Sequence, residues 1–135
     1  MEGINTLPHF NPDVHDSTET SVQSFREKIQ AADGVLLCTP EYVFSLPGSF
    51  KNALEWTVST MVFAEKPVAI IVASSAGEMA FESLKLIMRT LGARIEDKTC
   101  LLIQGARAKV SPPEKETYHQ ITKLMNAFME SMNQR

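Results

Sequence analysis

Apolar residues follow two patterns along the chain: helical spacing in some segments and short unbroken runs in others. Spacings of three and four positions place apolar side chains on one face of a helix. This spacing predicts helices with the apolar positions Val22, Phe25, Ile29 and Ala32, then Phe50, Ala53, Leu54, Thr57 and Val58, then Phe81, Leu84, Met88 and Leu91, and last Ile121, Leu124, Met125, Phe128 and Met132. The unbroken apolar runs at 35–38, 68–73 and 100–103 are typical of strands covered on both faces.

Residues that favour turns and helix ends mark the boundaries of these elements. The segment 1–16 contains several Pro, Asn and Asp residues and predicts an irregular lead-in. Ser17 is a possible cap of the first helix, Pro47 suits the first turn of the second, and Gly92 ends the third. We expect the Met residues of the last helix to fill the core.

Helix and strand alternate from the first predicted helix to the last. This order predicts an open α/β sheet, with parallel strands, right-handed crossovers and helices on both faces. The run at 35–38 is expected to be a central strand, because it is wholly apolar. The 135 residues contain no repeat, low-complexity tract or linker, so we expect a single domain.

Composition narrows the classes of partner and the compartment. Sixteen acidic and thirteen basic residues give a net charge of −3 without a basic block, which argues against nucleic acid or a membrane surface as partner. No apolar run approaches the ~20 residues that cross a bilayer, and no signal segment follows Met1, so we expect a cytoplasmic protein. Cys38 and Cys100 have no Cys or His at ligand spacing, which favours buried reduced thiols over a disulfide or zinc site.

Two loops that follow predicted strands form the candidate site, because ligands of open α/β sheets bind beyond the carboxyl ends of the strands. In the loop at 39–48, Pro40 and Pro47 restrict the backbone and Gly48 permits close packing. The N–H and C=O groups of such a loop can bind the edge of a planar heterocycle such as a flavin pyrimidine ring. The loop at 74–78 runs into a helix, whose N-terminal N–H groups would favour negative charge on a reduced ring.

The run Thr39-Pro40-Glu41-Tyr42, followed by Pro47-Gly48 and by Lys51-Asn52-Ala53-Leu54-Glu55-Trp56, resembles the signature of the NADPH-dependent FMN reductase family, which includes quinone, chromate and azo-dye reductases. The similarity extends from about Leu7 to the end of the chain. It implies a flavodoxin-like fold, FMN and NADPH or NADH as cofactors, and a homodimer or homotetramer. It also implies a cofactor-binding site without a catalytic side chain, made of Pro40, Glu41, Tyr42, Val43, Phe44, Ser74, Ser75 and Gly77.

The sequence differs from the family pattern in three respects. The family normally begins with a strand, a Gly-Ser-x-Arg phosphate-binding loop, a helix and a second strand, and this sequence starts after them, so we expect a domain incomplete at its N-terminus. Charge-assisted bonds to phosphate contribute about 1.5 to 3 kcal/mol each, so losing two or three would weaken FMN binding on the order of a thousandfold. Val43 replaces the usual Asn, and Met79 and Ala80 stand where many members have a Gly pair.

The first of these differences has a structural consequence. In the flavodoxin strand order 2-1-3-4-5, the absent first strand would lie beside the run at 35–38 and leave its apolar edge bare. Bare apolar edges favour association. We therefore expect that the chain is a fragment of a longer product, or that another chain covers this strand.

Two functions remain open. The first is an FMN-dependent NAD(P)H oxidoreductase, in which hydride passes from nicotinamide to flavin and electrons go on to a quinone, free flavin, azo compound or metal oxyanion. There the protein stacks donor and acceptor rings on the flavin and stabilises charge near it. The second is a non-enzymatic remnant or assembly subunit that keeps the fold but has lost FMN with the phosphate loop.

The remaining polar residues favour simpler roles. The histidines lack partners at ligand spacing, so we assign no metal site to His9, His15 or His119. Acyl transfer is a weak rival function, since the serines at 74 and 75 lack a Gly-x-Ser-x-Gly elbow. We expect Lys51, Asn52, Glu55 and Trp56 to organise a helix surface and subunit packing. A nucleotide phosphate or a solvated loop could account for Arg107 and Lys109.

Overall fold

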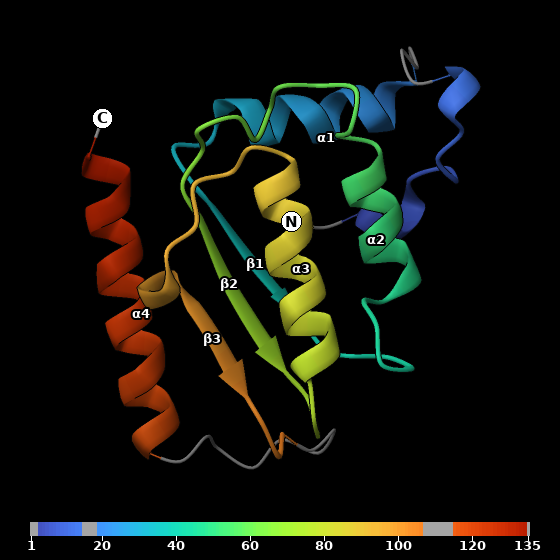
Figure 1. Cartoon of the computed structure of the whole chain (residues 1–135). Coiled ribbons are helices and arrows are strands. Elements are labelled where there is room, and N and C mark those ends of the chain that lie inside the picture. The colour runs from blue at the N-terminus through green and yellow to red at the C-terminus, as the bar shows by residue number, and fades with distance from the viewer. Residues whose placement is uncertain (1–2, 15–18, 107–114, 135) are drawn as a thin grey trace.

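The computed structural model describes residues 3–14, 19–106 and 115–134, and it contains helices and strands in alternation (Figure 1). The main elements are α1 (Thr20–Ala31), β1 (Val35–Thr39), α2 (Gly48–Glu55), β2 (Val68–Ala73), α3 (Glu78–Thr90), β3 (Cys100–Ile103) and α4 (Lys115–Asn133). Three short 3-10 helices, η1 (Ile4–Thr6), η2 (Pro12–Val14) and η3 (Asp97–Thr99), lie between them or before them. Each predicted helix and strand is therefore present.

The strands form one parallel sheet in the order β1-β2-β3. Val35 of β1 lies opposite Val68 of β2, and Ile70 of β2 lies opposite Cys100 of β3. Parallel pairing follows from the connections, since each strand is followed by a helix that returns the chain to the same edge of the sheet. The predicted open α/β sheet is confirmed.

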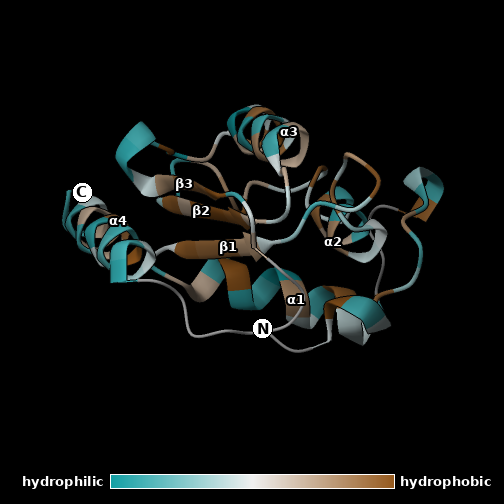
Figure 2. Ribbon diagram, turned by 90° about the horizontal axis from the view of Figure 1, so that it is seen from below, coloured by the Kyte–Doolittle hydropathy of each residue, from teal (hydrophilic) through white to brown (hydrophobic). Residues whose placement is uncertain are grey.

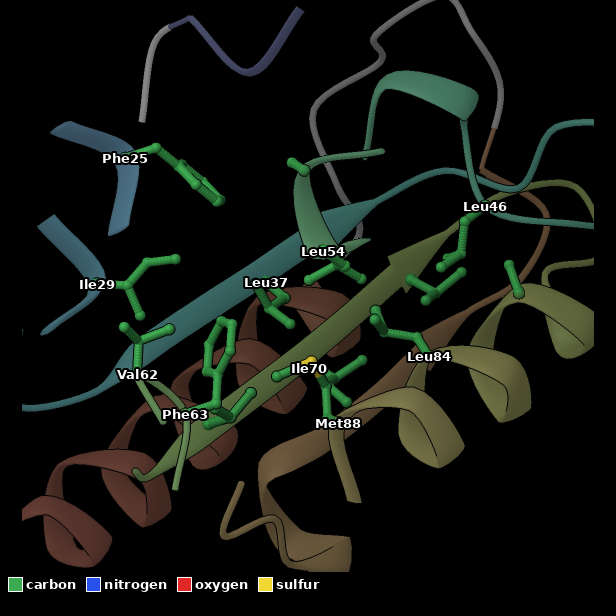
Figure 3. Packing of buried hydrophobic residues seen from close by; sticks show 14 residues of the cluster. Phe25, Ile29, Leu37, Leu46, Leu54, Val62, Phe63, Ile70, Leu84 and Met88 are labelled. Carbon is green, nitrogen blue, oxygen red and sulfur yellow. The ribbon is translucent and has the colours of Figure 1, made fainter. Parts of the chain in front are cut away.

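Helices cover both faces of the sheet, with α4 on one face and α1, α2 and α3 packed on the other (Figure 2). Alternate residues of β2 face the two layers, as the two-residue period of a strand requires. Ile70 packs with Leu84 and Met88 of α3 (Figure 3), while Ile71 packs with Phe128 of α4. Because both layers bury β2, its run of apolar residues is uninterrupted.

Strand β1 lies at one edge of the described sheet and β3 at the other, so the prediction of a central strand covered on both faces at 35–38 is wrong. One face packs on the core through Leu37, but Leu36 is 42% exposed and Cys38 is also exposed. By the two-residue period of a strand, Leu36 and Cys38 point to the face opposite Leu37, where α4 packs mainly on β2 and β3. The expectation of a bare apolar edge is confirmed for the described residues, and the expectation of a buried thiol at Cys38 is wrong.

Most helix ends agree with the sequence, and two differ. Helix α1 begins after Glu19, which makes no capping bond through its side chain, and Ser17 lies outside the described residues. Helix α2 ends at Glu55, so Thr57 and Val58 lie in the turns that follow and not on its apolar stripe. Gly92 follows the end of α3 at φ +79°, as predicted. None of the described helices has the length and apolarity that crossing a bilayer requires.

Asn52 and Trp56 of the α2 region fasten the lead-in segment to the domain. The Nδ2 group of Asn52 and the indole Nε1 of Trp56 donate hydrogen bonds to the Pro8 carbonyl, at 2.9 and 2.8 Å. Phe10 N–H donates in turn to Asn52 Oδ1 at 2.8 Å, and the Phe10 ring meets the indole edge-on. Lys51 instead forms an exposed ion pair with the carboxylate four residues later. Asn52 and Trp56 thus hold the lead-in within the chain, and Trp56 is buried and not part of the helix surface that the sequence predicted.

Candidate functional site

The three strands end on the same side of the sheet, where the arrowheads of Figure 1 point, and a loop follows each of them. This row of strand ends is called the carboxyl edge, as distinct from the side of β1. The loops after β2 and β3 are joined by backbone hydrogen bonds. Ser74 N–H donates to the Ile103 carbonyl at 3.1 Å, and Gly105 and Ala106 donate to the carbonyls of Ser75 and Ser74 at 3.2 and 3.1 Å. The turn after β2 therefore has a fixed position at this edge.

The loop after β1 folds into a tight two-residue turn. Tyr42 and Ser45 exchange backbone hydrogen bonds of 2.9 and 3.0 Å, and the residues between them, Val43 and Phe44, have φ of +51° and +55°. Two successive positive φ values are the signature of a type I′ turn, which normally requires Asn, Asp or Gly. A β-branched residue is strained in this conformation.

The tip of this turn presents apolar side chains to solvent. Tyr42, Val43 and Phe44 are 61%, 96% and 74% exposed. The Tyr42 N–H is used within the turn, whereas the described part of the chain provides no partner for the N–H groups of Val43 and Phe44. Exposed apolar groups beside free backbone donors are the features that a planar heterocycle needs for binding.

Glu41 connects the two loops. Its carboxylate accepts hydrogen bonds from Gly77 N–H at 3.1 Å through Oε1 and from Ala80 N–H at 3.0 Å through Oε2. Gly77 is the N-cap of α3 and Ala80 is its third residue, and neither has a side chain that can cap the helix. A side chain from the preceding loop therefore caps α3.

Gly77 is required at its position for two reasons. Its φ is +90°, a left-handed conformation that favours glycine, and a Cβ there would lie 2.8 Å from Leu102 Cδ1. The absence of a side chain thus lets the turn after β2 pack on β3 while its N–H group faces Glu41.

The structure brings the predicted cofactor-binding residues together at one edge, Pro40 to Phe44 in the first loop and Ser74, Ser75 and Gly77 in the second. It also adds Ala80, which the sequence did not single out. One feature of the sequence could have indicated this: neither Gly77 nor Ala80 has a side chain that can cap the helix. Since Glu41 already occupies two N–H groups of α3, only the remaining donors of its first turn are open to a negatively charged ligand.

The remaining candidate residues are the cations after β3, the histidines and the two cysteines. Arg107, Lys109 and His15 lie outside the described residues. Within the described ranges, no three His, Cys, Asp or Glu side chains are arranged to hold a metal ion. Both cysteines are free thiols, and partial burial raises the pKa of Cys100.

The parallel sheet with helices on both faces defines a flavodoxin-like α/β protein, and its linked loops lie at the carboxyl edge. The chain belongs to the NADPH-dependent FMN reductase family, whose model matches residues 1–107. The family consists of oxidoreductases that use FMN and NADPH or NADH. The expectations of family, fold, enzyme class and cofactors are thereby confirmed.

Individual relatives agree with this assignment. The chain is 31% identical over 129 residues to a quinone reductase of Escherichia coli (strain K12), covering 90% of this chain and 69% of that protein. It is 28% identical over 131 residues to an NADPH azoreductase of Bacillus sp. (strain OY1-2), covering 93% and 73%. The solved structure of the flavoenzyme NAD(P)H:(acceptor) oxidoreductase FerB from Paracoccus denitrificans superposes with a TM-score of 0.73 at 24% identity, covering 96% of this chain and 77% of that one.

The residues at the carboxyl edge fit the ring of FMN. The turn at 42–45 offers free N–H groups and exposed apolar surface, and the turn at 74–77 lies beside it through the Glu41 bonds. A flavin ring needs both kinds of contact, because its pyrimidine edge is polar and its faces are apolar. This fit applies to the flavin ring. Among the described residues at this edge there is no Lys or Arg that could bind the FMN phosphate.

Proposed function

We propose that the chain provides the ring-binding part of an FMN-dependent NAD(P)H oxidoreductase that reduces a small molecule: a quinone, free flavin, azo compound or metal oxyanion. The observation that supports this most is the Glu41 carboxylate, which joins the loop after β1 to the turn after β2 in a single surface. When bound there, FMN would supply the redox chemistry.

The chain's own residues bind and orient. Tyr42 and Phe44 would cover apolar parts of the ring and keep water away from it, which their exposure permits. The N–H groups of Val43 and Phe44 would bind acceptor atoms on the ring edge. Backbone hydrogen bonds of Ser74, Ser75 and Gly77 hold the second loop in place, and the ring of Pro40 restricts the backbone of the first. No side chain needs to act as an acid, a base or a nucleophile.

Flavin reconstitution tests this function. The chain is mixed with FMN and desalted, and the visible absorbance of retained flavin is measured, followed by NAD(P)H oxidation with a quinone. We expect retained flavin, and an affinity about tenfold lower for Phe44→Ser, because one stacked aromatic is lost. Met129→Ser, at an exposed methionine of α4, is the matched control. A colourless protein without NAD(P)H oxidation would favour the non-enzymatic remnant instead.

We also propose that two copies of the chain associate through α2 and α3. Between these helices lies an apolar groove of about 270 Å³, bordered by the exposed Val58 and Leu86. Lys51 and Glu55 lie at the rim of the groove and carry a positive and a negative charge, so the groove is complementary to the same groove of a second copy. Leu86→Asp should convert dimer or tetramer to monomer in light scattering, with Met129→Asp as control. A monomeric unmodified chain contradicts this proposal.

The edge of β1 supports a further proposal, that another strand completes the domain there. An apolar cavity of about 240 Å³ extends along Val35, Leu36, Leu37 and Cys38 and is bordered by α1 and α2. Amide hydrogen exchange tests it: if the amides of Leu36 and Cys38 are as protected as those of β2, the edge is covered in solution, and fast exchange shows that it is open.

We also propose a cytoplasmic location, with which the free thiols of both cysteines agree.

A further inference from the structure

Glu41 reaches across the site to a helix to which it is not connected in sequence. It lies 36 and 39 residues before the two amides that it binds. In an ordinary capping box, the N-cap side chain binds the third N–H and the third side chain binds the N-cap N–H. In α3 the corresponding residues are Gly77 and Ala80, and one carboxylate from another loop performs both tasks.

This arrangement has a mechanical effect. The turn at 42–45 is closed by its own backbone hydrogen bonds. It is joined to the rest of the site by the two hydrogen bonds that the Glu41 carboxylate accepts from Gly77 and Ala80. Hydrogen bonds to a charged acceptor are among the stronger ones in proteins. Removing the carboxylate would leave the two loops free to move relative to each other.

The arrangement also has an electrostatic effect. The positive end of the α3 dipole would stabilise added negative charge on a bound ring. Glu41 places its own negative charge at that end, and Glu78 of the first turn adds a second carboxylate, which accepts a bond from Gln104. The site therefore opposes accumulation of charge on a reduced ring.

We propose that Glu41 is a positioning residue that fastens the loop after β1 to the N-terminus of α3 and lowers the reduction potential of FMN bound beside it. The first part concerns the chain alone, and the second rests on the proposed function. A glutamine has one carbonyl oxygen and no charge, so Glu41→Gln keeps one of the two bonds and removes the charge. Glu41→Ala removes both bonds.

Amide hydrogen exchange in the chain without FMN tests the fastening. We expect the amides of Gly77 and Ala80 to exchange about tenfold faster or more in Glu41→Ala, with one of them still protected in Glu41→Gln. Glu27→Gln is the control, since Glu27 is exposed on α1 and carries the same charge. Far-UV circular dichroism checks that each variant is folded. If both amides exchange equally fast with and without Glu41, the fastening is overturned.

Redox titration of bound FMN tests the charge. In Glu41→Gln we expect reduced FMN to bind about tenfold more tightly relative to oxidised FMN, which raises the two-electron potential by about 30 mV. If the potential shifts no more in Glu41→Gln than in Glu27→Gln, the proposed effect of Glu41 on the potential is overturned, and the proposed function still stands. If no variant and no unmodified chain holds FMN, the proposed function and the effect on potential both fail, and hydrogen exchange still decides the fastening.

Discussion

Replacing Val43 by asparagine should stabilise the protein, because the native residue is strained and gains little from packing. Val43 has φ +51° in a turn whose next residue also has positive φ. Left-handed backbone costs a non-glycine residue about 1–3 kcal/mol, and asparagine much less than a β-branched residue. At 96% exposure, the valine side chain has almost no buried surface to lose. We expect a gain of about 1 kcal/mol, which corresponds to a rise in melting temperature of about 4 °C.

Urea unfolding followed by circular dichroism measures this gain. Val43→Gly should gain less, because glycine adds conformational freedom to the unfolded chain. Val14→Asn is the matched control, an exposed valine that is not among the residues with positive φ, and it should bring no gain. If Val43→Asn is no more stable than the native chain, backbone strain at this turn does not limit stability and the reasoning is refuted.

Three further outcomes are expected. Gly77→Ala should destabilise the fold by about 2 kcal/mol in urea unfolding, since its φ of +90° and a Cβ only 2.8 Å from a leucine methyl both oppose a side chain; native stability would contradict this. Asn52→Ala should cost about 2 kcal/mol through its lost bonds to the lead-in, whereas Lys51→Ala, at an exposed ion pair, should cost less than about 0.5 kcal/mol. A thiol reagent should label the more exposed Cys38 before Cys100. Partial desolvation raises the pKa of both thiols, so both labelling rates should rise over a higher pH range than for a free cysteine; faster labelling of Cys100 would show that the β1 edge is covered.

The sequence predicted the elements of the fold well where local pattern determines them. The run at 68–73 is apolar at each position because both faces of β2 are covered, and the structure confirms the predicted strand there. Gly92 marks the end of α3 because the chain must adopt a positive φ there. Both signals lie within a few residues of the feature that they predict.

Local pattern failed where the environment of a residue depends on distant parts of the chain. The run at 35–38 has the same apolar character as β2, yet β1 lies at the edge of the described sheet. Nothing within the run distinguishes the two strands, because the number of neighbours depends on what packs beside a strand. Val58 continues the apolar spacing of α2, but the helix ends before it.

The site shows the same division. Family resemblance predicted site residues at 40–44 and at 74, 75 and 77, and the parallel topology places both loops at the carboxyl edge of the sheet. The resemblance did not indicate that Glu41 binds Gly77 and Ala80. These residues are separated from Glu41 by 36 and 39 positions, and no periodic pattern in the sequence marks a hydrogen bond over such a distance.

By itself, the sequence determined the order of helices and strands, their parallel pairing and the position of the candidate site loops, because hydrophobic period and turn residues act over short distances. Tertiary structure alone decided that Val43 is held in a strained turn and that Glu41 caps a helix from another loop. These features arise from contacts between segments that only the folded chain brings together.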